Sequence, residues 1–193
     1  MEEIIVFDFD KTLTNYDTTF KFYLFCSRNN PRKYIFCYLF FFIKIASKLK
    51  IISVKKEKEL GLKFFCSSDE QKFLEQCYQF SKTIKLNSLY DNEFKAIDQR
   101  HYKIIIASAS FQYYLEWLFP NITVIGALVE INKKGKIVGI KQHPYSVEKA
   151  NLLQSNNIIK INKFYTDSFT DLPTSKISDI TFLVENGKIV KSF

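Results

Sequence analysis

The sequence predicts an α/β protein, in which a doubly wound parallel sheet carries a helical segment inserted after its first strand. Three observations predict this fold. Residues 4–7 form a short apolar run, typical of a strand covered on both faces, and two aspartates follow it. From residue 91 onward, strand and helix patterns alternate. Between these parts, residues 18–86 show apolar side chains at helical spacing only.

These patterns divide the chain into a core of residues 1–14 and 88–193 and a helical cap of residues 15–87. In the cap, Pro31 predicts the start of one helix, and the polar stretch Ser67–Glu70 predicts the start of another. One apolar side of the second helix should face the protein interior: Phe73, Leu74, Cys77 and Phe80.

The second part of the core should begin with a helix that ends near Arg100, followed by a buried strand at residues 103–110. A helix up to Pro120 and a hairpin that turns at Lys134–Gly135 come next. The remaining predicted elements are a helix at 146–155, a strand at 163–168 and a strand with a hairpin at 179–193.

The composition supports a packed, charged protein. Apolar residues make up 47% and aromatic residues 17% of the 193 residues, which argues against disorder. The net charge of +8 is uneven, because residues 15–100 contain 16 Lys and Arg against 9 Asp and Glu. Such a basic region suits an anionic substrate, an acidic membrane surface or nucleic acid, and it is equally typical of a solvated lysine-rich surface.

The cysteines and the start of the chain favour the cytoplasm. Cys26, Cys37, Cys66 and Cys77 are separated by 11, 29 and 11 residues, which is not the spacing of a metal site. Glu2 and Glu3 lead directly into the first strand, so we expect no signal peptide. We therefore expect free thiols in a reducing compartment.

Polar side chains follow the strands at the edge where ligands bind in open α/β sheets. Asp8 and Asp10 end the first strand, Ser108 ends the second, and Asp167 and Asp171 follow a later one. A lysine, Lys149, lies early in the helix before that later strand. Carboxylates, a hydroxyl and an ammonium at one edge are suited to a magnesium ion and a phosphate group. One carboxylate can attack phosphorus, and a second can move protons.

Four segments, DFDKTLT, IIIASAS, VEKANLL and YTDSFTDLP, resemble in order the four motifs of the haloacid dehalogenase (HAD) superfamily phosphatases. The insertion after the first motif resembles the phosphoserine-phosphatase-like branch, so the resemblance implies a HAD-like, Rossmann-like sheet with an α-helical cap. It also implies hydrolysis of phosphomonoesters through an aspartyl phosphate, with Mg²⁺ as cofactor. By this resemblance, Asp8 is the nucleophile and Asp10 is the general acid/base. Ser108 and Lys149 would bind the phosphate, with Asp171 and Thr12 as supporting residues. The implied metal ligands are Asp8, Asp167 and the backbone carbonyl of Asp10.

Simpler roles remain open for several of these positions. Ser110 and Asp171 could each cap a helix. Lys141 is a weaker rival of Lys149 for the phosphate-binding role, and His143 fits a loop residue without a catalytic task.

The substrate is less clearly indicated. Phosphoserine phosphatases resemble one another in a glutamate nine residues after the nucleophile, where this chain has Asp17, and in a cap arginine, which residues 33–99 lack. Lysine is a poor substitute for an arginine that clamps a carboxylate. A small or lipid-linked phosphate is therefore favoured, with phosphoserine as an alternative. DFDKTLT together with DTTFKFYLF also resembles the opening of bacterial phosphatases of this branch that include phosphatidylglycerophosphatase C, which keeps a lipid phosphate under consideration.

The cap contains an uncharged run at residues 34–43, far shorter than the roughly 20 residues of a spanning helix. This run could form the core of the cap, which we favour, or an interfacial helix at the inner face of a membrane. A non-catalytic protein that binds a membrane or nucleic acid is the competing hypothesis, but nucleic acid is disfavoured because the chain has only three arginines and no recognisable binding motif. The oligomeric state is not indicated.

Overall fold

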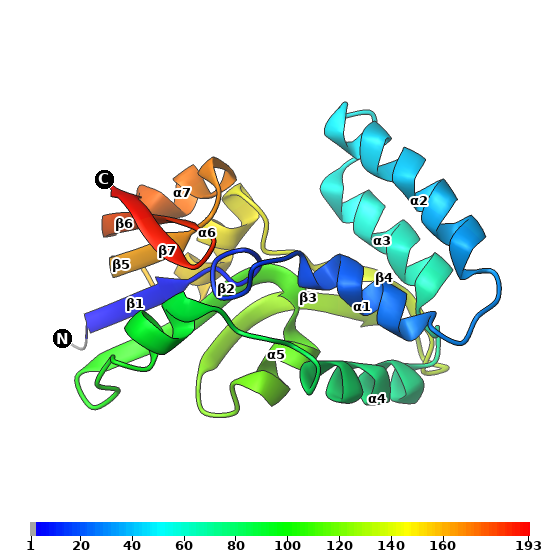
Figure 1. Cartoon of the computed structure of the whole chain (residues 1–193), viewed down its shortest axis with the longest axis horizontal. Coiled ribbons are helices and arrows are strands. Elements are labelled where there is room, and N and C mark those ends of the chain that lie inside the picture. The colour runs from blue at the N-terminus through cyan, green and yellow to red at the C-terminus, as the bar shows by residue number, and fades with distance from the viewer. Residues whose placement is uncertain (1–2) are drawn as a thin grey trace.

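The computed structural model describes residues 3–193, so Glu2 and the first residue of the predicted core lie outside it. Seven strands form one sheet in the order β4-β3-β2-β1-β5-β6-β7 (Figure 1). The five inner strands are parallel, whereas β4 and β7 pair antiparallel at the edges. The strands are β1 Glu3–Phe7, β2 Tyr102–Phe111, β3 Thr123–Ile131, β4 Ile137–Gln142, β5 Ile161–Thr166, β6 Ser178–Glu185 and β7 Lys188–Ser192. The predicted fold class is confirmed.

In the described residues, seven α-helices connect these strands: four lie between β1 and β2, and three lie between later strands. They are α1 Thr18–Cys26, α2 Lys33–Lys48, α3 Val54–Phe65, α4 Glu70–Ser81, α5 Gln112–Leu118, α6 Val147–Ser155 and α7 Leu172–Ser175, with a π-helix at Tyr90–Phe94 and a 3-10 turn at Phe169–Asp171. Three cap helices begin at polar residues that accept a backbone N–H: Asp17, Ser53 and Asp69. These local caps explain why α4 begins where the sequence predicts it.

Two predictions about the elements are wrong. The helix expected to end near Arg100 is a π-helix that ends at Phe94. Helical structure does not continue to Arg100 because the side chain of Asp98 accepts the backbone N–H of Arg100 at 3.0 Å and forms a turn there. Leu74 does not share the buried side of α4 and is exposed, whereas Phe73 and Cys77 are buried.

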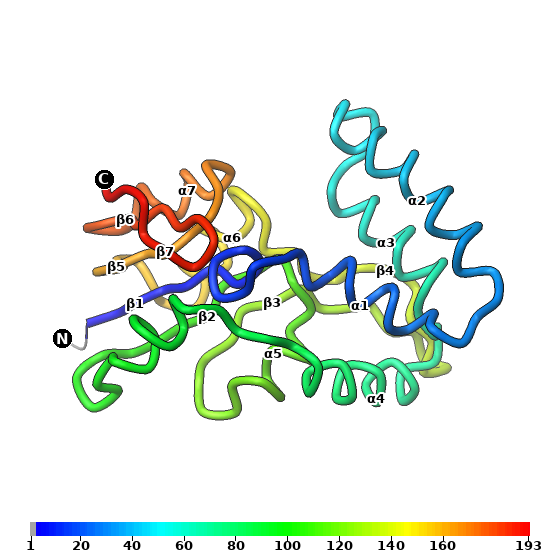
Figure 2. Tube along the Cα trace, viewed as in Figure 1, coloured from blue at the N-terminus to red at the C-terminus, as the bar shows by residue number. Residues whose placement is uncertain are grey.

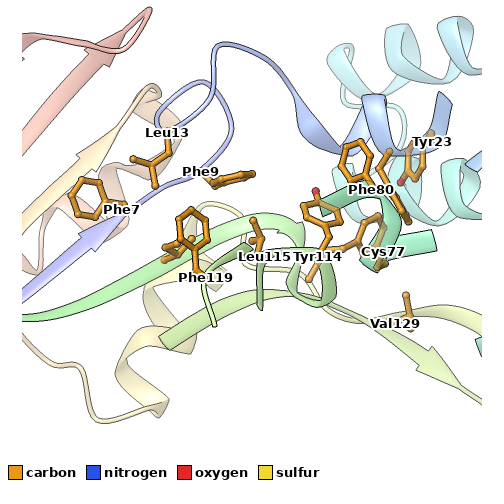
Figure 3. Close-up of a cluster of buried hydrophobic side chains, with 14 of the residues drawn as sticks. Phe7, Phe9, Leu13, Tyr23, Cys77, Phe80, Tyr114, Leu115, Phe119 and Val129 are labelled. Carbon is orange, nitrogen blue, oxygen red and sulfur yellow. The ribbon is translucent and has the colours of Figure 1, made fainter. Parts of the chain in front are cut away.

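The buried side chains lie on both faces of the sheet. One cluster, which includes Val6, Phe164 and Leu153, lies beneath α6. The other begins with Phe7 in the core and continues through Tyr114 into the cap helices (Figure 3). Core and cap therefore share one continuous apolar interior.

The cap leaves the core and returns to it at one place. The backbone N–H of Asn87 donates to the carbonyl of Leu13 at 2.9 Å. Its side-chain amide donates to the carbonyls of Thr12 at 2.8 Å and Thr14 at 3.2 Å. Asn87 thus joins the two chain segments that connect cap and core.

Helices α2 and α3 form an arm that stands away from the sheet, with α2 as its outer member (Figures 1 and 2). The inner side of α2 is held by aromatic contacts. Phe36 stacks on Phe64 of α3 with ring centroids 5.7 Å apart, and Phe40 packs edge-on against both Tyr23 of α1 and Phe65 of α3. Across residues 3–193, no helix has both the length and the apolar character needed to cross a membrane.

Candidate active site

The predicted site residues meet at the carboxyl end of the parallel strands. A small cavity of about 220 Å³ is lined by Asp8, Asp10, Asp17, Ser108, Lys149, Asp167 and Asp171, among others. Thr12 is not part of this lining; it is fully buried, and its hydroxyl has no hydrogen-bond partner among the described residues. The topology therefore brings together every predicted residue except Thr12.

A buried ammonium connects two of the carboxylates. The Nζ of Lys149 lies 3.0 Å from Oδ1 of Asp8 and 2.7 Å from Oδ2 of Asp171. The hydroxyl of Thr166, at the end of β5, also donates to Asp171 at 2.9 Å. Burial lowers the pKa of Lys149, but the two aspartates outweigh burial and raise it above its ordinary value. The two ion pairs therefore favour the charged form of Lys149 in this cavity.

The structure shows where the alternative residues lie for two of these positions. Lys141 is exposed on β4, whereas Lys149 reaches the strand ends from the first turns of α6. Asp171 occupies the cap position of α7 but makes no side-chain cap bond there. Its carboxylate is instead committed to Lys149 and Thr166.

Asp10 has different neighbours from Asp8. Its carboxylate accepts hydrogen bonds from the backbone N–H and the hydroxyl of Thr18 and, at 2.7 Å, from the hydroxyl of Ser110. The Thr18 hydroxyl also lies 2.9 Å from the Tyr114 hydroxyl. The alternative that Ser110 caps a helix is wrong, because Phe111 occupies that position at α5 and Ser110 belongs to β2.

Burial changes the acidity of both aspartates. It raises the pKa of Asp8 to about 7, with Lys149 lowering the value and the charges of Asp171 and Asp167 raising it further. It raises the pKa of Asp10 to about 6, supported by the charge of Asp17 and opposed by the hydrogen bonds from Thr18 and Ser110. A carboxyl group with a pKa near 6 can both hold and release a proton near neutral pH.

The donor set is suited to magnesium. Asp8, Asp167 and the carbonyl of Asp10 would supply hard oxygen ligands, and burial and the nearby charge of Asp171 raise the pKa of Asp167 above its usual range. Across residues 3–193, no three Asp, Glu, His or Cys side chains form an enclosing metal site. Magnesium needs no such cage, since it usually binds one or two carboxylates together with waters and substrate phosphate. The excess of carboxylates over ammonium groups in the small cavity also favours a cation.

A larger cavity of about 950 Å³ adjoins the small one, because Asp10, Asp17, Ala109 and Tyr145 line both. Residues of α1, α2 and α3 supply most of its wall, together with the loop after β4. Residues of these three helices thus border a cavity next to Asp10.

Asp17 lies at the junction of these two cavities. Its carboxylate caps α1 by accepting the backbone N–H of Phe20 at 2.9 Å, and it lies 3.6 Å from the Nζ of Lys44 on α2. Asp17, the residue predicted to select substrate, therefore also caps a helix. Lys44 partly neutralises the negative charge of its carboxylate.

Lys58 lines the larger cavity, a position that the sequence does not reveal. It extends from α3 to the core, where its Nζ donates to the carbonyl of Ala109 and lies 4.6 Å from the ring centroid of Phe111. Burial lowers its pKa to about 8, although the charges of Asp10 and Asp17 act in the opposite direction. Nothing in the spacing of the cap lysines distinguishes Lys58, because only the tertiary fold places it in the cavity wall.

His143 follows β4 in a loop, as predicted, but it is buried in the wall of the larger cavity. Its Nε2 atom has no hydrogen-bond partner among residues 3–193. Burial, together with the charges of Lys58 and Lys55, lowers its pKa to about 3. The imidazole is therefore neutral at physiological pH.

Comparison with known protein families agrees with this geometry. Residues 5–176 match the profile of the haloacid dehalogenase-like hydrolases. The chain belongs to this family. The family resemblance predicted from the four HAD motifs is therefore confirmed, and the match extends across both cap and core.

Solved structures share the HAD fold of this chain. A protein of unknown function from Bordetella pertussis Tohama I has a TM-score of 0.75 at 13% identity, covering 91% of this chain and 87% of that one. A phosphoserine phosphohydrolase-like protein from Francisella tularensis subsp. tularensis SCHU S4 has a TM-score of 0.66 at 15% identity, with 95% and 87% covered. A phospho-aspartyl intermediate analogue of phosphoserine phosphatase has a TM-score of 0.61 at 15% identity, with 94% and 86% covered. No curated protein matches the chain by sequence.

Proposed function

We propose that this HAD protein is a magnesium-dependent phosphatase that hydrolyses phosphomonoesters through an aspartyl phosphate on Asp8. The observation that carries the proposal is the contrast between two aspartates at the end of β1. Asp8 lies 3.0 Å from the ammonium of Lys149, whereas Asp10 accepts hydrogen bonds from the hydroxyl groups of Thr18 and Ser110. We assign the nucleophile to the aspartate beside the phosphate-binding cation and proton transfer to the other aspartate.

In the first step, a carboxylate oxygen of Asp8 attacks the phosphorus atom, and the bond between phosphorus and the ester oxygen breaks. Asp10 donates its proton to the departing oxygen, which leaves as an alcohol. In the second step, Asp10 takes a proton from a water molecule that attacks the phosphorus atom. The bond to Asp8 then breaks, which releases inorganic phosphate and regenerates both aspartates.

Lys149 and Ser108 have supporting tasks in this proposal. The ammonium of Lys149 and the hydroxyl of Ser108 would bind phosphoryl oxygens and stabilise the charge that develops during transfer. Thr166 and Asp171 hold Lys149 in place. A magnesium ion held by Asp8, Asp167 and the carbonyl of Asp10 would neutralise negative charge on the phosphate.

The alcohol part of the substrate would occupy the larger cavity, whose wall includes the buried cation of Lys58. This supports a phosphate ester of a small or lipid-linked alcohol that carries a further negative charge. Phosphoserine fits the same description and is the alternative substrate, supported by the fold shared with phosphoserine phosphatase. A panel of phosphoserine, glycerol phosphate and lysophosphatidic acid, assayed with magnesium, would distinguish these classes.

The nucleophile can be tested by substitution. We expect Asp8→Asn to abolish magnesium-dependent hydrolysis of p-nitrophenyl phosphate and to leave the fold intact, because the amide cannot form the acyl phosphate. The matched control is Asp179→Asn, which changes an exposed aspartate of β6 that pairs with Lys160. In the wild-type protein, beryllium fluoride with magnesium should form an adduct on Asp8. Near-normal turnover in Asp8→Asn, or an adduct on another residue, would remove Asp8 from the mechanism.

A further inference from the structure

The outer side of α2 exposes an unusual amount of apolar surface. Nine large side chains, which we call the outer face of α2, are each between 41% and 74% exposed. They are Tyr34, Ile35, Tyr38, Leu39, Phe41, Phe42, Ile45, Leu49 and Ile51. At about 200 Å² for a large side chain, they expose on the order of 1,000 Å², whereas the largest apolar patch of a typical monomer is about 300–600 Å².

The outer face of α2 is not the side of the helix that packs against the rest of the cap. The opposite side of α2 already packs on the protein through Phe36 and Phe40. The exposure of the outer face shows that neither α3 nor the sheet covers it, and α2 is the outer helix of the arm (Figure 1). The sequence favours residues 34–43 as the core of the cap. That prediction is wrong for most of these residues, since only Phe40 among them is fully buried.

The charge around this face is of one sign. Residues 18–56 contain nine Lys and Arg and no Asp or Glu. Exposed cations lie at both ends of α2, with Arg28 and Arg32 before it and Lys48 and Lys50 at its end. The helix of 16 residues is about 24 Å long, so an apolar strip of that length lies between two cationic ends.

We propose that the outer face of α2 docks on an anionic lipid surface, with the helix lying in the plane of that surface. Apolar and aromatic side chains would enter the interfacial layer, and the flanking cations would contact anionic head groups. A second copy of the chain suits this face less well, because a symmetric contact would bring two wholly cationic segments together. The docking goes beyond the proposed catalytic function and does not depend on it.

The larger cavity extends toward the docking face. Asp10 lines one part of its wall, and Lys48, Lys50 and Ile51 line another. Lys48 is the last residue of α2, and Ile51 is the last residue of the outer face. A docked molecule would therefore hold this part of the cavity at the lipid surface.

The test is co-sedimentation of the whole protein with vesicles, which requires no phosphatase readout. We expect the protein to sediment at low salt with phosphatidylcholine vesicles that contain phosphatidylglycerol and not with phosphatidylcholine alone. The double variants Phe41→Gln/Phe42→Gln and Lys48→Glu/Lys50→Glu should each reduce binding by about tenfold or more. Because these four side chains are exposed, circular dichroism should show unchanged folding.

Matched controls separate docking from a general change in surface. Lys133→Glu/Lys134→Glu makes the same charge change in the exposed hairpin turn, and Trp117→Gln removes an exposed aromatic side chain from α5. Both should bind anionic vesicles as the wild type does. Failure of the wild type to sediment, or equal losses in the controls, would overturn the proposal. A wild-type dimer that Phe41→Gln/Phe42→Gln converts to a monomer would do so too, since a second copy would then cover the face.

Discussion

Asp8 and Asp10 lie two residues apart, yet their side chains meet different chemistry. Asp8 forms an ion pair with the ammonium group of Lys149, and Asp10 accepts hydrogen bonds from hydroxyl groups of α1 and β2. Burial disfavours ionisation of both; Lys149 lowers the pKa of Asp8, and hydrogen bonds from Thr18 and Ser110 lower the pKa of Asp10. In the proposed mechanism, this difference assigns the nucleophile to one residue and proton transfer to the other.

His143 offers a test of burial at the residue scale. Its pKa is about 3 in the folded protein and 6.5 ordinarily, so only the unfolded chain binds the proton between these values. Stability should therefore fall as pH falls from 6.5 toward 3, by up to about 1.4 kcal/mol per pH unit from this residue. His143→Asn should remove that part of the decline. Urea unfolding at pH 7.5 and pH 4.5 would measure it.

The control for this prediction is His101→Asn, because the side chain of His101 is exposed. It should follow the wild-type pH dependence. If His143→Asn loses as much stability as the wild type on acidification, then His143 does not remain neutral in the folded state.

Sequence reasoning could find the residues whose positions follow from strand ends. Asp8 and Asp167 directly follow strands of the parallel sheet, and Ser108 lies in β2 beyond Ile106, the last residue of β2 that pairs with β1, so topology alone brings them together. Lys58 and His143 could not be found in this way. Their positions depend on how α3 and the loop after β4 approach each other, and neither residue belongs to a local motif.

At the scale of elements, α1 and α3 approach closely where α3 has a glycine. A Cβ atom on Gly61 would lie 2.3 Å from Cε2 of Tyr23, whose hydroxyl donates to the carbonyl of Lys58 at 2.9 Å. We expect Gly61→Ala to destabilise the protein by about 1–3 kcal/mol through overpacking. Most of this range exceeds the roughly 1 kcal/mol that alanine gains over glycine in a helix.

Urea unfolding would measure this effect, with Gly139→Ala as the control. A Cβ atom on Gly139 would meet only side-chain atoms of Glu130 and Glu59, each at 3.5 Å, which is ordinary contact. A Gly61→Ala variant as stable as the wild type would show that Tyr23 moves aside without cost.

The elements that the sequence predicts correctly are those with strong local signals. The start of α4 follows from Asp69, and the hairpin of β3 and β4 follows from Gly135, which has a positive φ of 66°. The segment after Phe94 was predicted wrongly because a side-chain turn at Asp98 competes with the helix. The outer face of α2 was misjudged for another reason, since periodicity does not reveal whether a partner covers an apolar helix.

At the scale of the whole molecule, Lys58 connects the cap to the core at the edge of the proposed site. The charge of Lys58 would attract a leaving group that carries a carboxylate. Lys58→Met should then lower kcat/KM for phosphoserine by about tenfold or more relative to p-nitrophenyl phosphate, whose leaving group has no carboxylate. The long apolar side chain of methionine should preserve the packing. The comparison of the two substrates measures selectivity rather than general damage.

Lys56→Met is the matched control, because Lys56 lies on the same helix with its side chain 57% exposed. It should leave the ratio between the substrates unchanged. An unchanged ratio in Lys58→Met as well would assign Lys58 to joining cap and core without a part in substrate selection.

The contact of Asn87 with residues 12–14 has a consequence for how such a protein can change over time. Because the inserted segment begins and ends at one point, the core spans the same short gap whatever the length of the insertion. Closing a longer excursion costs only a slowly growing entropy, about 0.6 kcal/mol for each doubling. The sheet and its reaction chemistry could therefore be inherited intact while the insertion is lengthened, shortened or exchanged, which would redirect one ancestral reaction to new substrates and new places in the cell.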